Sequence, residues 1–175
     1  AVLYQVKEEV VFPTILSEET PFVQGENIKH PLLQEKEAVG NPVNLQAETA
    51  IITGSNMSGK TTYLRSIGSN LCLAYAGAPV CAKAFAVSCM QVFTSMRITD
   101  DVNKGISTFY AELLRIKSMV TYSKNQKPMI CLIDEIFKGT NSADRIVGAE
   151  ETIKKLSRPW CITVVSTHDF ELCQL

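Results

Sequence analysis

A glycine-bounded segment at residues 54–61 constrains the fold of this chain more than any other feature. It reads Gly-Ser-Asn-Met-Ser-Gly-Lys-Thr, which fits the pattern Gly-x-x-x-x-Gly-Lys-[Ser/Thr] of a phosphate-binding loop, the P-loop. Residues 50–53 are apolar or β-branched and predict a buried strand, while residues 62–76 have the length and spacing of a helix. A strand, a tight turn and a helix in this order are the setting that such a loop requires. The segment therefore predicts an α/β fold with a phosphate site at the start of a helix.

Each part of this loop has a physical role in binding a nucleotide. Gly54 and Gly59 let the backbone turn closely around a phosphate chain, because they carry no Cβ. Lys60 supplies a charge for the β- and γ-phosphates, and the Thr61 hydroxyl is placed to ligate Mg²⁺. The loop amides attract anions together with the helix N-terminus. The candidate residues for binding ATP in this loop are Gly54, Ser55, Asn56, Met57, Ser58, Gly59, Lys60 and Thr61.

Two carboxylates follow a second apolar run, at residues 129–133. The run predicts a buried parallel strand whose C-terminal end lies at the same sheet edge as the P-loop. There we expect Asp134 to hold Mg²⁺, together with Thr61, and Glu135 to polarise the water that attacks the γ-phosphate. Many strands leave a sheet through acidic residues, so the assignment depends on the pairing with the P-loop.

Histidine occurs only twice in this chain, at positions 30 and 168. His168 follows a third apolar run, residues 161–165, and is expected to reach the same edge as Glu135. An imidazole there would contact the γ-phosphate and report its presence. His30 precedes Pro31, and two interpretations remain open for it: a position near the nucleotide, or a residue of a turn.

Composition and charge limit the class of protein. A chain of 175 residues with 46% hydrophobic residues suits one globular domain, and its net charge of −1 gives no overall attraction to DNA or acidic membranes. The six cysteines include no Cys-x-x-Cys pair, which predicts reduced core thiols and a cytoplasmic location. No signal peptide or long apolar stretch predicts contact with a membrane. Because the chain does not begin with Met, we expect it to be a fragment of a longer protein.

The whole chain, residues 1–175, is interpreted as a single domain with two unequal parts. Residues 1–50 are expected to form a small antiparallel portion, and residues 51–175 a P-loop core with a largely parallel central sheet flanked by helices. Further elements are expected at residues 4–11 and 87–96 (strands), and at 108–123 and 143–156 (helices).

Five short motifs occur in order along the chain. They are residues 53–62, Gly-x-Ser-Thr-Phe-x-x-Glu at 105–112, Leu-Ile-Asp-Glu at 132–135, Gly-Thr-Asn-Ser-x-Asp at 139–144 and Ser-Thr-His-Asp at 166–169. From about Asn27 to its end, the chain resembles the ATPase domain of MutS-type DNA mismatch repair proteins, which belong to the ABC ATPase superfamily. The resemblance implies a P-loop NTPase of the ABC-ATPase type that hydrolyses ATP with Mg²⁺, weakly as an isolated domain. It adds Thr62 to the nucleotide-binding residues, and Lys60, Glu135 and His168 would be the catalytic set.

The resemblance also implies an ATP site shared between two subunits. Two such domains would form a head-to-tail homodimer, in which Ser107 and Thr108 of one subunit reach the γ-phosphate held by Lys60 of the other. Asn141 lies in the segment that would cross this interface. From the residues alone, Ser107 is more simply a helix cap. DNA would be contacted through domains outside this chain, because no Phe here is followed by x-Glu, the mismatch-reading pattern of MutS proteins.

The leading interpretation is the ATP-binding and hydrolysing module of a MutS-like DNA repair protein, with nucleotide-driven dimerisation controlling DNA-bound states. One alternative is an ABC-type ATPase serving another process such as transport, but Gly-Ile-Ser-Thr-Phe replaces the Leu-Ser-Gly-Gly-Gln expected for that class. A second alternative is a nucleotide-gated dimerisation module with little turnover, against which Glu135 argues.

Overall fold

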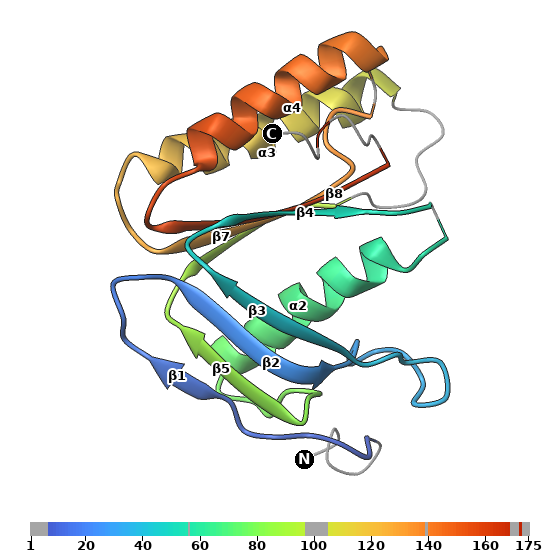
Figure 1. Ribbon diagram of the computed structural model, residues 1–175, viewed down its shortest axis with the longest axis vertical. Coiled ribbons are helices and arrows are strands. Elements are labelled where there is room, and N and C mark those ends of the chain that lie inside the picture. Colours follow the sequence, from blue (N-terminus) through green and yellow to red (C-terminus); the bar gives the residue numbers. More distant parts are fainter. Residues whose placement is uncertain (1–6, 56, 97–104, 139, 169–171, 173–175) are drawn as a thin grey trace.

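The structure, a computed structural model, describes residues 7–55, 57–96, 105–138, 140–168 and 172, with the backbone alone for 105–108. Its strands are β1 (Thr14–Leu16), β2 (Phe22–Ile28), β3 (Asn41–Gln46), β4 (Thr49–Thr53), β5 (Ala84–Ser88), β6 (Gln91–Ser95), β7 (Met129–Asp134) and β8 (Cys161–Thr167), and its helices are α2 (Lys60–Tyr75), α3 (Gly105–Ser123) and α4 (Ser142–Leu156). These elements stack as a mixed sheet, α2, a parallel sheet, and a layer of α3 with α4 (Figure 1). None of the helices in the described ranges has the length and apolar character needed to span a bilayer.

The parallel sheet has the strand order β4-β8-β7-β6, and every neighbouring pair in it is parallel. All residues of β7 and β8 are buried, as expected for strands with helices on both faces. Helix α2 covers one face, and α3 and α4 cover the other (Figure 1). This confirms the predicted α/β architecture with a parallel sheet between helices, and it confirms the two later helices.

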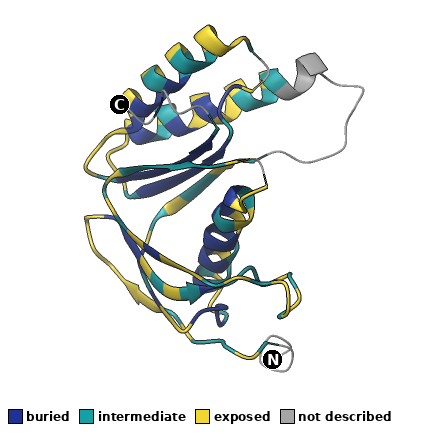
Figure 2. Cartoon of the chain, turned by 45° about the vertical axis from the view of Figure 1, so that its right-hand side comes forward, coloured by how far each residue is buried: buried dark blue, intermediate teal, exposed yellow. Residues whose placement is uncertain are grey.

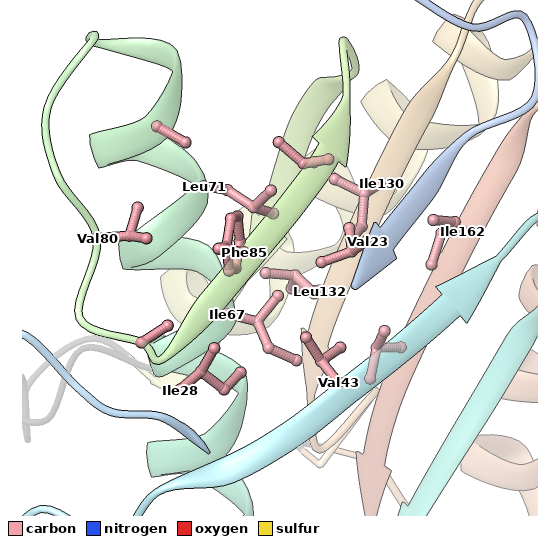
Figure 3. Close-up of a cluster of buried hydrophobic side chains, with 14 of the residues drawn as sticks. Val23, Ile28, Val43, Ile67, Leu71, Val80, Phe85, Ile130, Leu132 and Ile162 are labelled. Carbon is pink, nitrogen blue, oxygen red and sulfur yellow. The ribbon is translucent and has the colours of Figure 1, made fainter. Parts of the chain in front are cut away.

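The mixed sheet has the order β1-β5-β2-β3, in which β2 is antiparallel to β3 and β5, and β1 is parallel to β5. The expectation of an antiparallel portion built from residues 1–50 alone therefore needs correction. Strand β5 comes from beyond α2 and completes the sheet, because Phe85 and Val87 share a buried cluster with Val23, Val43 and α2 (Figure 3). The strand expected at residues 4–11 lies partly outside the described residues, and Val11 forms only an isolated bridge with Val80.

The single strand expected at residues 87–96 is two strands in different sheets. The Cys89 amide donates to the carbonyl of Leu16, whereas the Gln91 amide donates to the carbonyl of Pro128, next to β7. The backbone thus changes sheets within two residues. One apolar run therefore serves both sheets, since each of its halves packs against the same α2 cluster.

The core has two parts, one on each face of the parallel sheet. On the first face, Leu64, Ile67 and Leu71 of α2 pack in one cluster with Ile130 and Leu132 (Figure 3). The second cluster joins α3 and α4 to the opposite face of β7 and β8. Figure 2 shows the resulting bands of buried residues through the sheet and α2. A rigid parallel sheet fixes the positions at which its strands end, and those ends carry the predicted site residues.

Candidate functional site

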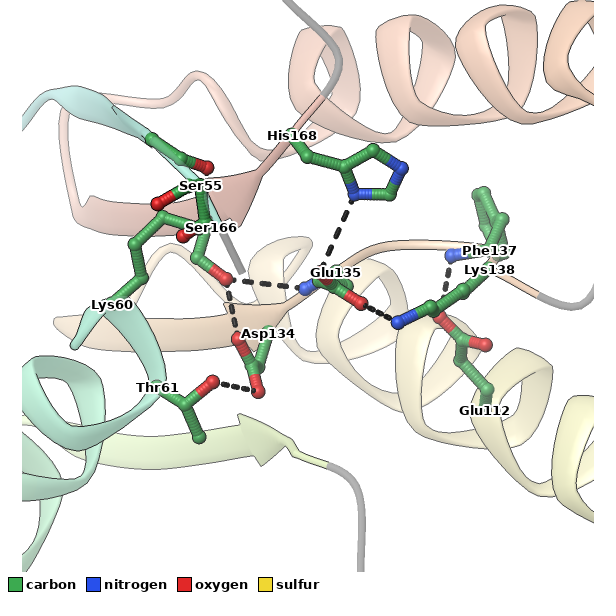
Figure 4. Close-up of polar contacts among 11 residues, drawn as sticks. Ser55, Lys60, Thr61, Glu112, Asp134, Glu135, Phe137, Lys138, Ser166 and His168 are labelled. Atoms are coloured by element: carbon green, nitrogen blue, oxygen red, sulfur yellow. Dashed lines mark hydrogen bonds and ion pairs between the residues drawn. The ribbon is translucent and has the colours of Figure 1, made fainter. Parts of the chain in front are cut away.

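The predicted residues converge where β4, β7 and β8 end and α2 begins. Lys60 and Thr61 open α2, Asp134 ends β7, and His168 follows β8. The register pairs Asp134 with Ser166 on the adjacent strand, so the polar ends of the two strands lie side by side. Figure 4 shows Thr61 and Ser166 directed toward Asp134, and His168 directed toward Glu135, at this edge.

The loop that precedes α2 closes around the Lys60 side chain. Its ammonium donates to the carbonyls of Gly54 at 2.5 Å and Ser55 at 2.7 Å, and Lys60 is only 7% exposed. Gly54 and Gly59 have φ values of 151° and 86°, which non-glycine residues rarely adopt. A Cβ on Gly54 would also lie 2.9 Å from Ser58 Oγ, which donates to the Ser55 carbonyl. The glycines therefore make possible a tight loop with a buried cation at its centre.

Asp134 joins three elements through its two carboxylate oxygens. Oδ2 accepts a hydrogen bond from Thr61 Oγ1 at 2.8 Å, and Oδ1 accepts one from Ser166 Oγ at 2.5 Å (Figure 4). The residue is 9% exposed. A hydroxyl and a carboxylate in contact at a helix N-terminus are oxygen ligands of the kind that Mg²⁺ prefers. The arrangement suits a divalent cation next to the P-loop.

Glu135 lies beyond the end of β7, and its carboxylate contacts two basic side chains. One is Lys138, and the other is His168, whose Nδ1 lies 3.3 Å from Glu135 Oε1. The side chain is 14% exposed, and burial alone would raise its pKa. The nearby Lys138 and His168 outweigh that effect, and the pKa of Glu135 lies below its ordinary value of 4.5. Glu135 is therefore ionised at neutral pH, and its carboxylate is engaged by the Lys138 ammonium and the His168 imidazole.

The turn that carries Glu135 is held by α3 and α4. Glu135 and Phe137 both have a φ of 54°, an uncommon left-handed conformation for such residues. The Phe137 amide donates to Glu112 Oε1 of α3 at 2.6 Å, and its ring contacts Phe109 edge-on at 6.4 Å between centroids. On α4, Gly148 leaves room for the same ring, since a Cβ there would lie 2.9 Å from it. Packing on both helices thus maintains the unusual backbone of this turn.

The other residues predicted for the site lie in the loop before α2, at the starts of helices or outside the described residues. Asn56 lies outside the described residues, and so do the side chains of Ser107 and Thr108, whose backbone forms the first turn of α3. Met57 is 98% exposed at the tip of the P-loop, and Thr62 continues α2. Asn141 caps α4, because its side chain accepts a hydrogen bond from the Asp144 amide at 2.9 Å.

His30 lies in a turn, one of the two positions left open by the sequence. Its carbonyl accepts a hydrogen bond from the Leu33 amide, and its Nδ1 accepts one from the Leu32 amide. Burial lowers the pKa of His30, with a smaller contribution from Arg65.

Three residues of the site carry roles that sequence reasoning did not assign. Ser166 bridges Asp134 and the Glu135 amide, to which its Oγ lies 3.3 Å away, and its place at the end of a neighbouring strand was the available signal. Glu112 was noted only as part of a motif. No sequence pattern indicated a role for Lys138, because its pairing with Glu135 depends on the left-handed turn that carries them.

Comparison with known proteins gives a family match over most of the chain. The model of MutS domain V matches residues 50–175. This finding corrects the resemblance drawn from sequence, which named the ATPase domain of MutS-type proteins within the ABC ATPase superfamily and began at about Asn27. The matched unit is domain V of MutS, and it starts within β4, so β2 and β3 precede it.

Individual relatives agree with this match. The chain is 35% identical to DNA mismatch repair protein MutS of Staphylococcus epidermidis, over 86% of this chain and 18% of the relative. It is 30% identical to DNA mismatch repair protein spellchecker 1 of Drosophila melanogaster, over 94% of this chain and 19% of the relative. It is also 30% identical to MutS of Clostridium kluyveri, over 84% and 18% respectively. The chain thus spans less than a fifth of the length of these relatives.

Proposed function

The chain belongs to the MutS family, and from this premise we propose that it is the ATP-binding and hydrolysing module of a MutS-like DNA mismatch repair protein. The observation that carries the proposal is the 2.8 Å hydrogen bond between Thr61 at the end of the P-loop and Asp134 at the end of β7. It brings together the two halves of a nucleotide site that lie far apart in the sequence.

The residues at this edge fit a magnesium–triphosphate group. Thr61 and Asp134 would hold the ion, and the ion when bound would offset the charge of the phosphates. Lys60 is already buried and bound by two backbone carbonyls, so it would exchange these partners for phosphate oxygens without changing the fold. Gly54 and Gly59 have positive φ values and carry no Cβ that would crowd the loop amides. These features support ATP and Mg²⁺ as the ligands of this site.

Glu135 would act as the general base in hydrolysis. Its lowered pKa keeps the carboxylate ionised, which is the form that orients and polarises water. In the structure Lys138 and His168 hold this carboxylate. A productive arrangement would release Lys138 and leave His168 beside the γ-phosphate. Removing a base of this kind typically slows the chemical step by about 10²–10⁴-fold.

The same reasoning supports a shared site in a head-to-tail homodimer. Ser107 and Thr108 lie at the N-terminus of α3, where free amides favour a negatively charged ligand. In the proposed dimer they would face the γ-phosphate of the partner subunit, and Asn141 would lie beside the interface. ATP would then favour the closed dimer by as much as its affinity differs between monomer and dimer. DNA contacts would belong to the parts of a longer protein that flank this domain.

A nucleotide-gated dimerisation module with little turnover is a second candidate. One observation favours it: the Glu135 carboxylate is occupied by Lys138 and His168 and is held in a left-handed turn. In that case ATP would close the dimer, but the base would rarely be released.

Measurement of ATP binding and hydrolysis with matched variants separates these proposals. Lys60→Ala should abolish most Mg-ATP binding, and Glu135→Gln should keep binding but lose hydrolysis. Lys117→Ala, an exposed lysine of α3, is the control and should change neither. Unchanged ATP affinity in a folded Lys60→Ala variant would exclude the proposed site. Turnover equal to the parent in Glu135→Gln would exclude Glu135 as the base, and ATP-dependent dimers with negligible turnover in the parent would favour the second candidate.

A further inference from the structure

A pocket lies at the edge of the parallel sheet opposite the candidate nucleotide site. Its volume is about 550 Å³, and it is lined by Val120, Ser123, Lys124, Gln126, Lys155, Arg158 and Trp160. Trp160 directly precedes β8 and His168 directly follows it, so seven strand residues, roughly 23 Å at 3.3 Å each, separate the pocket from the site. Figure 1 shows α3 and α4 ending on this side of the sheet, away from the turn between β4 and α2. The pocket is therefore distinct from the nucleotide site.

Trp160 forms a fixed wall of this pocket. Its indole Nε1 donates to the carbonyl of Ser123, the last residue of α3, at 2.7 Å. Its own carbonyl accepts a hydrogen bond from the Met129 amide at 2.9 Å, which ties it to the start of β7. The ring is half-buried, and Val120 adds a second apolar surface. A rigid aromatic wall beside an apolar side chain can receive an apolar group with little loss of conformational entropy.

Three cations surround this apolar interior. Lys124, Lys155 and Arg158 line the pocket and are all exposed, and none of its lining residues, each of which the structure describes, is acidic. The end of a helix favours cations, which accounts in part for Lys155 in the last turn of α4. That effect does not explain why three cations meet at a hollow with an indole wall. The adjacent Lys154, in contrast, pairs with Glu150 at 2.7 Å on the same helix.

We propose that this pocket binds an acidic peptide segment of a protein partner. An apolar side chain of the segment would enter the hollow against Trp160, and flanking carboxylates would pair with Lys124, Lys155 and Arg158. This is the usual plan of a small protein interface, with an apolar anchor in the centre and charges on the rim. The volume fits one or two side chains and lies within the range of ligand pockets.

Charge and shape favour a peptide over nucleic acid. Duplex DNA binds to an extended row of cations through its phosphates and has no apolar group that would enter a hollow of this kind. The net charge of the chain is −1, so the cations are a local feature and not part of a generally basic surface. This inference concerns a partner and not the nucleotide, and it holds independently of the proposed ATPase activity.

Trp160 is the only tryptophan of the chain, so its fluorescence reports binding at this pocket directly. The probes are synthetic hexapeptides in which one central residue, Leu, Ile, Phe or Met, is flanked by aspartates. Matched peptides carry asparagine in place of aspartate, or glycine in place of the central residue. At least one acidic peptide should change the fluorescence saturably, and both kinds of matched peptide should bind at least several-fold more weakly.

Variants on the pocket rim provide the second part of the test. The double variant Lys155→Gln with Arg158→Gln should weaken binding of the acidic peptide by roughly three- to tenfold, as expected for two exposed ion pairs. Lys154→Gln, one position away on the same helix, should leave it unchanged. Because these side chains are exposed, the fold should persist, and circular dichroism would verify this. The proposal would be overturned by no saturable response to any acidic peptide, by equal effects of the rim variant and Lys154→Gln, or by single-stranded DNA displacing every peptide at lower concentration.

Discussion

The carboxylate of Glu112 lies 2.6 Å from the backbone nitrogen of Phe137 and accepts its hydrogen bond. Glu112 is on α3, and Phe137 is two residues after Glu135, so this contact ties the helix to the turn that carries the proposed base. The start of α3 is also the segment proposed to face the partner's nucleotide. A displacement of α3 on dimerisation would therefore be transmitted to Glu135 through this charge-assisted hydrogen bond and the packed Phe109–Phe137 rings.

Removal of this contact should destabilise the fold. Glu112→Ala leaves the Phe137 amide without its acceptor beside a buried ring, and we expect a loss of about 1–3 kcal/mol in the free energy of unfolding. Glu112→Gln keeps an acceptor oxygen and should lose less. Urea denaturation would measure both, with Glu151→Ala, an exposed residue of α4, as the control. A loss no larger in Glu112→Ala than in the control would show that the hydrogen bond does not hold the turn.

The P-loop, β7 and β8 could be predicted from sequence because each is a local pattern: a glycine spacing, or an apolar run that ends in polar residues. The division between β5 and β6 could not, since residues 87–96 form one apolar run and the choice of sheet depends on distant partners. The carbonyls of Leu16 and Pro128, more than a hundred residues apart, accept from Cys89 and Gln91. Local propensity does not encode such pairings.

Gly148 should be intolerant of a side chain. A Cβ at this position would lie 2.9 Å and 3.0 Å from two ring carbons of Phe137, which α3 holds from the other side. Gly148→Ala should therefore cost about 1–3 kcal/mol, although alanine is the better helix former. The double variant with Phe137→Leu should recover part of this loss, because a smaller side chain relieves the overlap. A double-mutant cycle of thermal or urea unfolding would measure the coupling, and strictly additive effects would contradict it.

Lys138 should control the ionisation of Glu135. Burial opposes the charged carboxylate, so Lys138→Met, which removes the ammonium paired with it, should raise the pKa of Glu135. Carboxyl NMR titration of the parent and the variant would measure this change. Lys83→Met, at an exposed lysine paired with Glu26 in the mixed sheet, is the control and should leave the Glu135 titration unchanged.

The lowered pKa of Glu135 also affects how the stability of the fold responds to acid. Because the folded-state pKa of Glu135 lies below 4.5, its ionised form stabilises the fold above that pH, and this contribution is lost as pH falls through the folded value. In Lys138→Met the contribution should be smaller, so stability should depend less on pH in this acidic range. A carboxyl titration identical in both proteins would show that Lys138 does not govern the site.

The polar contacts of the site were predictable only where the sheet register imposes them. Asp134 and Ser166 end adjacent strands, and Thr61 begins the helix beside them, so their meeting follows from the order of the elements. The pairing of Lys138 with Glu135 needs a backbone with φ of 54° at two residues that are not glycine. Tertiary packing, and not sequence propensity, imposes that conformation.

A shared ATP site makes a specific prediction for mixed subunits. Lys60→Ala disables the P-loop of its own subunit, and Ser107→Arg places a bulky side chain where the partner's γ-phosphate would lie, so each variant alone should be inactive. In a head-to-tail dimer of one subunit of each kind, both changes fall in the same site and the other site is intact. Equal mixing should recover roughly one quarter of parental ATPase activity, because half of the dimers are mixed and each has one working site.

Protein concentration must be raised until dimers form, as judged by light scattering with ATP present. Each variant assayed alone at the same total protein concentration is the control and should show no activity. Mixing that restores no activity while mixed dimers are demonstrably present would mean that each subunit completes its own site. In that case Ser107 would remain only a residue at the start of α3, and ATP binding would need another route to the partner subunit.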